Sequence, residues 1–122
     1  MEDTNNLWSY YKTLVKNESF PCLVLDLDLF NENISSITKR LENNTENKKT
    51  IRVASKSVRS IAILRKIFES NEIYKGILSY SLREALFLHN KGFKDIVVAY
   101  PEINEKDISV LCKEISSRIF PL

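Results

Sequence analysis

The chain has 122 residues, of which 43% are hydrophobic and 28% charged, as in one ordinary globular domain or part of a larger one. Its 18 basic and 16 acidic residues are scattered and leave a net charge of +2, which argues against nucleic acid as a partner. No apolar run approaches the roughly 20 residues of a membrane-spanning helix, and the polar, acidic start at residues 1–6 is unlike a signal peptide, so neither a membrane nor secretion is expected.

The first third of the chain predicts a helix, a strand and a second helix. Residues 1–20 form a helical segment with apolar residues at helical spacing, and Pro21 ends it. The apolar run at 22–26 indicates a buried strand. Asp28 is placed to cap the next helix, whose apolar face would consist of Phe30, Ile34, Ile37 and Leu41.

Strands and helices alternate through the remaining sequence. Helices are expected at about 58–69 with Ser57 as N-cap, from the capping residue Ser81 to about Asn90, and after Asn104. Strands are expected at 51–55, 73–79, 95–99 and from residue 118 onward. This alternation predicts an α/β fold with a parallel sheet and right-handed crossovers. Either an open doubly wound sheet or about half of a (β/α)₈ barrel fits, because a whole barrel typically takes about 250 residues.

The cysteines and the single histidine do not form a metal-binding pattern. Cys22 and Cys112 lie far apart in apolar contexts, which indicates reduced structural thiols in a cytoplasmic protein. His89 has no second histidine or cysteine at ligand spacing. We therefore expect no metal site built from these residues.

Lys56 occupies the position with the most chemical potential. It directly follows the strand expected at 51–55, and the carboxyl ends of strands are where α/β sheets and barrels place their ligands. A lysine there can neutralise a phosphate or form a Schiff base with a carbonyl cofactor. The chain has no Gly-rich phosphate loop, so Lys56 is not a P-loop lysine. A surface lysine in a strand-to-helix turn is the other interpretation.

Asp26 and Asp28 offer a second chemistry. Two carboxylates after an apolar strand can bind Mg²⁺ or attack a phosphoryl group, as in a phosphatase-like open α/β sheet. The alternative is that Asp28 only caps the following helix.

Four stretches carry a family resemblance when they are taken together, in order and at matching spacing. The first is P-x-L-V-x-D-x-D-x4-N-I beginning at Pro21, and the second is R-x-x-x-K-[ST] at 52–57. The third is the strand and E-A helix at 76–85, and the fourth is the run at 92–101, similar to G-x-x-D-I-L-V-A-Y-P. Over 21–101 the chain thereby resembles the D-threonine aldolase and alanine racemase N-terminal-domain family.

The resemblance implies a fold-type III pyridoxal-phosphate enzyme, with a (β/α)₈ barrel followed by a β-domain. After the helical segment at 1–20, it implies a partial, truncated barrel domain at 21–122. The strand at 22–26 would precede the barrel and pack with the β-domain. The barrel strands would lie near 51–55, 75–79, 95–99 and 118–122. Half a barrel leaves a strand edge open, so self-association through that edge is expected.

The resemblance also assigns roles to residues. Lys56 would hold pyridoxal phosphate as a Schiff base and then move protons, for which its amine should be partly desolvated. The other cofactor-site candidates are Ser79, Tyr80 and Tyr100, which would line the pocket, and Arg59, which would either contact the cofactor or face solvent. The substrate would be a small amino acid, and the reaction an aldolase or racemase reaction, with the R-x-x-x-K-[ST] form favouring an aldolase. A non-catalytic α/β fragment is the alternative.

Overall fold

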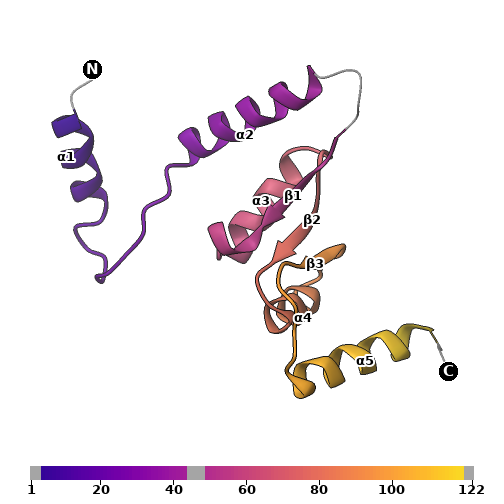
Figure 1. Cartoon of the computed structure of the whole chain (residues 1–122). Coiled ribbons are helices and arrows are strands. Elements are labelled where there is room, and N and C mark those ends of the chain that lie inside the picture. The colour runs from indigo at the N-terminus through magenta and orange to yellow at the C-terminus, as the bar shows by residue number, and fades with distance from the viewer. Residues whose placement is uncertain (1–3, 44–48, 120–122) are drawn as a thin grey trace. The chain divides into compact units, whose positions relative to one another are not determined.

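The computed structural model describes residues 4–43 and 49–119, with side-chain surroundings for 6–43 and 49–115 (Figure 1). The described residues form an α/β fold with a three-stranded parallel sheet and five α-helices. The chain divides into two compact units, residues 1–35 and 36–122, so the division falls inside a helix and later than residue 20. The parallel α/β sheet predicted from the sequence is confirmed.

The first unit contains helix α1 (Thr4–Leu14) and the start of helix α2 (Leu27–Glu42). The buried strand predicted at 22–26 is wrong, because these residues belong to no strand and Leu23 is fully exposed. Apolar character alone does not make a strand, since the backbone groups also need a partner strand.

Helix α2 begins one residue earlier than Asp28, the residue expected to cap it. The carboxylate of Asp26 accepts hydrogen bonds from the backbone N–H groups of Asp28 and Leu29, at 3.0 and 3.1 Å. Asp26 is therefore the N-cap, and the prediction that Asp28 caps this helix is wrong.

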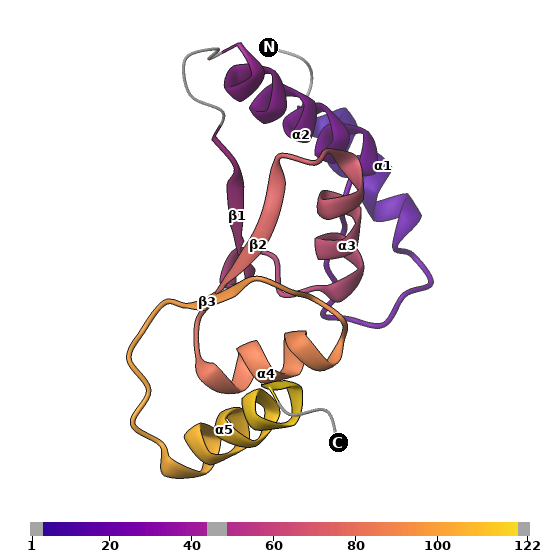
Figure 2. The ribbon, with the colours of Figure 1, turned by 90° about the vertical axis from the view of Figure 1, so that its right-hand side faces the viewer.

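The second unit is built on strands β1 (Ile51–Ala54), β2 (Tyr74–Ser79) and β3 (Ile96–Val98). All pairs are parallel and the strand order is β1-β2-β3, which Figure 2 shows with the strands side by side. The two crossover connections, from β1 to β2 and from β2 to β3, place the carboxyl ends of all three strands at the same edge of the sheet.

Helices α3 (Ile61–Ser70), α4 (Leu82–Asn90) and α5 (Glu105–Ile119) complete the second unit. Both α3 and α4 contact β2, while α4 also contacts β3 and α5. The buried apolar side chains of this unit come from its strands, from α3 and α4, and from the turn after α4: Val53, Leu64, Ile67, Tyr74, Ile77, Leu82, Ala85, Leu88 and Phe93.

Two boundaries in the second unit differ from the prediction. Residues Ser55–Ser57 form a 3₁₀ turn, η1, and α3 begins only at Ile61, where the Ser60 hydroxyl accepts a hydrogen bond from the N–H of Ile63. Ser60 rather than Ser57 is therefore the N-cap. The strand expected from residue 118 is also wrong where the structure describes it, because α5 continues to Ile119. Residues 120–122 of that strand lie outside the described residues.

An arginine clamp joins the strands near their amino ends. Arg52 on β1 reaches across β2 and donates two hydrogen bonds to the carboxylate of Asp95, at 2.9 and 3.0 Å, and a third to the Asp95 carbonyl. Gly76 lies beneath the guanidinium, at a bulge where β2 has one residue more than β1. A Cβ atom at Gly76 would collide with the Arg52 guanidinium and with the Asp95 carbonyl.

Gly76→Ala tests the clamp. The substitution adds a steric collision to an unfavourable positive φ of 73°, so we expect the free energy of unfolding to fall by roughly 2–4 kcal/mol in urea titrations. Gly92→Ala is the matched control: its φ is 90°, but no atom lies within 4 Å of the added Cβ, so only the backbone cost of about 1–2 kcal/mol applies. Equal losses of unfolding free energy in the two variants would contradict the close approach of Arg52 and Asp95 to Gly76.

Candidate functional site

The carboxyl edge of the sheet brings the predicted site residues to one region. Lys56 follows β1, Ser79 ends β2 with Tyr80 directly after it, and Tyr100 lies two residues after β3. Parallel strands place these ends along one edge, which is where ligands bind in α/β proteins.

Lys56 is presented by the 3₁₀ turn η1. Ser55, the residue before it, is buried (1% exposed), and its hydroxyl donates to the Leu78 carbonyl on β2 at 3.3 Å. The Ser55 carbonyl accepts the N–H groups of Val58 and Arg59, at 3.0 and 2.8 Å. The Lys56 side chain itself is exposed, so the partial desolvation expected for its amine is not provided by the described residues.

Arg59 folds back onto the turn that carries Lys56. Its Nε–H donates to the Lys56 carbonyl at 3.2 Å, and its backbone has a positive φ of 47°. Arg59 also lines a cavity of about 280 Å³, together with Ser55, Ser60, Ile61, Leu64, Glu84, Phe87 and Leu88.

Ser79 is fully buried, and its hydroxyl is directed toward the protein. The Oγ atom lies 2.8 Å from the Ser81 carbonyl and 3.2 Å from the Glu84 carboxylate. The same carboxylate accepts the N–H of Tyr80 at 2.8 Å, while the Ser81 hydroxyl accepts the N–H of Glu84 at 3.2 Å. This arrangement joins the end of β2 to the first turn of α4, and Ser81 caps that helix as the sequence predicted.

Tyr80 and Tyr100 form an aromatic pair between neighbouring strand ends. Their ring centroids lie 5.2 Å apart in a T-shaped arrangement, and each residue is 54% exposed. The pair places aromatic ring surface and two phenol groups at the carboxyl edge of the sheet.

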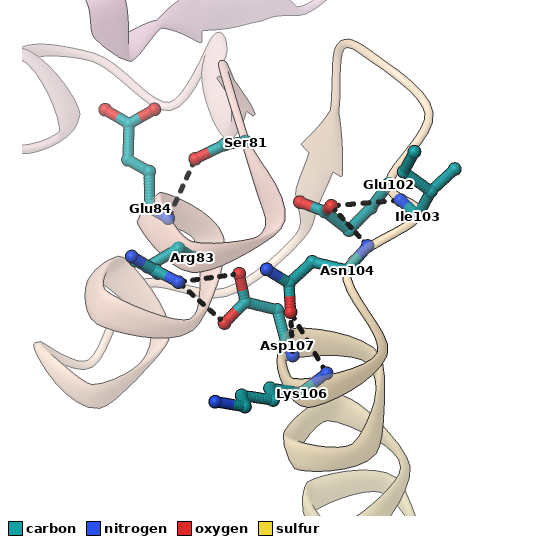
Figure 3. A network of polar contacts seen from close by, with 8 residues as sticks. All are labelled: Ser81, Arg83, Glu84, Glu102, Ile103, Asn104, Lys106 and Asp107. Atoms are coloured by element: carbon teal, nitrogen blue, oxygen red, sulfur yellow. Dashed lines mark hydrogen bonds and ion pairs between the residues drawn. The ribbon is translucent and has the colours of Figure 1, made fainter.

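Figure 3 shows how the loop after β3 is held. The Glu102 carboxylate accepts the N–H groups of Ile103 and Asn104, at 2.9 and 2.8 Å. Asp107 on α5 pairs with Arg83 on α4 at 3.3 Å. The loop that carries Tyr100 is therefore anchored at its carboxyl-terminal end to the beginning of α4 and α5.

The cap of α5 is the one that the sequence predicted. The Asn104 side-chain oxygen accepts the N–H groups of Lys106 and Asp107, at 3.0 and 3.3 Å.

Two supporting residues were missed from the sequence. Ser55 is buried like Val53 two residues earlier, so the alternation of side chains along the strand could have predicted that Ser55 faces inward. Glu102 precedes the cap residue Asn104 by two positions, and an acidic side chain there can serve the backbone amides of the approaching chain.

Asp26, the other predicted chemical centre, is occupied with structural contacts. Besides capping α2, its carboxylate accepts the Tyr11 hydroxyl at 2.9 Å. The hydrogen bonds from the Leu29 N–H, the Tyr11 hydroxyl and the Asp28 N–H lower the pKa of Asp26, outweighing desolvation. The Tyr11 pKa is raised, chiefly by the same hydrogen bond.

Among the residues that the structure describes, no group of three or more histidine, cysteine, aspartate or glutamate side chains could hold a metal ion. No helix of that part combines the length and the apolar character needed to cross a bilayer.

Comparisons of this chain with protein families, with curated protein sequences and with solved structures found no match.

The Tyr11–Asp26 contact predicts a pH dependence. A lowered pKa in the folded state means that Asp26 contributes stability above its unfolded pKa, near 3.8, and loses it as pH falls through the lower folded value. In an NMR titration of the Asp26 carboxyl carbon, we expect a midpoint below 3.8 that rises in Tyr11→Phe. Tyr10→Phe, beside it on α1, is the control and should leave the midpoint in place. An unchanged midpoint in Tyr11→Phe would contradict the contact.

Proposed function

We propose that this chain forms the first part of a (β/α)₈ barrel in a cytoplasmic pyridoxal-phosphate enzyme that acts on small amino acids. The observation that carries the proposal is the position of Lys56, presented on a hydrogen-bonded turn directly after β1. It shares the carboxyl edge of the sheet with the aromatic pair of Tyr80 and Tyr100. The sequence resemblance over 21–101 supports the same interpretation.

The residues at this edge fit the cofactor's chemical groups in part. Lys56 supplies the primary amine that would attach the cofactor through its Nζ atom. The Tyr80–Tyr100 pair supplies ring surface for a flat heteroaromatic group, and Arg59 supplies a cation within the same turn. Ser79, with its buried and hydrogen-bonded hydroxyl, would support the wall behind them.

When bound, pyridoxal phosphate withdraws electrons from the α-carbon of an attached amino acid. Lys56, once released from the cofactor, would hold or return a proton near that carbon. An aldolase reaction is the preferred assignment on the R-x-x-x-K-[ST] motif, and a racemase reaction is the alternative. In the proposed enzyme, later barrel strands would cover Lys56 and help to hold the phosphate.

Labelling of Lys56 tests the proposal. The purified chain is incubated with pyridoxal phosphate, reduced with borohydride, and mapped by peptide mass spectrometry. We expect the label mainly on Lys56, and a visible absorbance band that Lys56→Ala loses. Lys66→Ala removes another exposed lysine, on α3, and should keep both. Label spread evenly over many lysines, and equal in all three proteins, would refute the cofactor site and favour a non-catalytic α/β chain.

We also propose that the open sheet edge supports self-association. In the described sheet, β1 and β3 each pair on one side only, with β2, and unpaired edges are templates for further strands. Val97 on β3 is 45% exposed.

Sedimentation velocity of the Val97→Lys variant tests self-association through the β3 edge. We expect the wild-type chain to form dimers or larger species, and the variant to shift toward monomer, because a charge on an edge strand opposes pairing. Val110→Lys changes an equally exposed valine on α5 and should sediment as the wild type. A monomeric wild-type chain at high concentration would contradict self-association.

A further inference from the structure

We propose that Arg59 is a positioning residue that fixes the direction in which the turn presents Lys56. This inference rests on the proposed role of Lys56 as the residue that attaches the cofactor. It gives Arg59 a role different from both direct contact with the cofactor and a side chain that only faces solvent, the two roles that the sequence left open.

The hydrogen bonds of the turn converge on the two residues around the reactive side chain. The Ser55 carbonyl accepts two backbone N–H groups, from Val58 and Arg59. The Lys56 carbonyl accepts the Nε–H of Arg59 at 3.2 Å. The backbone of Lys56 is thus held by the Arg59 side chain, while that of Ser55 is held by main-chain bonds.

The turn is also attached to the sheet. Ser55 is buried and donates to the Leu78 carbonyl of β2 at 3.3 Å. Ser55 fixes the start of the turn on β2, and Arg59 fixes its end on the Lys56 carbonyl. With both ends fixed, the direction of the Lys56 Cα–Cβ bond is set relative to the strand end that leads to Tyr80.

The backbone conformation of Arg59 is the independent observation. A φ of 47° is costly for a residue with a Cβ atom and easy for glycine. Such a conformation persists where the surroundings require it, and these positions concentrate at functional sites. Here the strained residue uses its side chain to hold the carbonyl of the candidate catalytic lysine.

Two roles of Arg59 can be separated by two substitutions. Arg59→Lys keeps the positive charge but removes the Nε–H that reaches the Lys56 carbonyl. Arg59→Gly removes the side chain and also relieves the strain of the positive φ. A charge effect on Lys56 would survive in the lysine variant, whereas a positioning effect would be lost in both.

The experiment combines three measurements on the whole chain: hydrogen exchange of the Val58 amide, the melting temperature, and the ratio of pyridoxal-phosphate label on Lys56 to that on Lys66 after borohydride reduction. We expect both Arg59 variants to exchange Val58 faster and to label Lys56 several-fold less selectively. Arg59→Gly should nevertheless melt at or above the wild-type temperature. A residue that served stability alone would not lower labelling in such a variant.

Arg65→Lys is the matched control, because Arg65 also donates to a backbone carbonyl, that of Lys91 at 2.7 Å, but from α3. It should leave Val58 exchange and Lys56 labelling unchanged. Given a selective wild-type chain, wild-type-like labelling of Lys56 in either Arg59 variant would overturn the positioning role.

The two proposals fail in different ways. An unselective wild-type chain refutes the cofactor site, and Val58 exchange in Arg59→Gly still decides whether Arg59 holds the turn. A selective wild-type chain with an equally selective Arg59→Gly variant refutes the positioning role only.

Discussion

The arrangement of the second unit depends on the contact between Arg52 and Asp95 across Gly76. Parallel strands have no tight hairpins to set their register, so register comes from side-chain contacts and crossover connections. Here one guanidinium joins β1 to the residue that precedes β3, and the absence of a side chain at Gly76 lets it cross β2. This contact near the amino ends therefore adds to the bonds that join the strands at their carboxyl ends, from Ser55 to Leu78 and from Ala99 to Ser79.

At the carboxyl edge, each connection is held by a side chain that bonds to nearby backbone. Ser55 and Arg59 hold the turn after β1, Glu84 holds the end of β2, and Glu102 holds the loop after β3. These bonds lie in or next to the segments that carry Lys56 and the two tyrosines. A site assembled from three separate connections needs this support, because small displacements of reacting groups are costly in catalysis.

The strands and helices of the second unit could be predicted because apolar runs mark the strands and clear caps, such as Ser81 and Asn104, mark where helices begin. The run at 22–26 has the same composition, but a strand exists only with a partner, which local pattern does not reveal. Serines at 57 and 60 were equally good caps by residue type, and only the 3₁₀ turn selected Ser60. The position of Lys56 at a strand end was predictable from the sequence. Its exposure and the hydrogen bond from the Arg59 side chain to the Lys56 carbonyl depend on three-dimensional contacts.

In the proposed enzyme, one part of the structure would determine which lysine attaches the cofactor, and another part would make the amine of that lysine reactive. The turn decides which lysine is presented at the strand ends, and this part is complete within the described residues. The Lys56 side chain is exposed, however, and only a neutral amine attacks a carbonyl carbon. The desolvation that favours the neutral amine has to come from whatever covers the edge. Selective attachment of the cofactor to Lys56 therefore tests how the turn presents this lysine. Catalytic turnover would test whether the covering part of the enzyme supplies the desolvation.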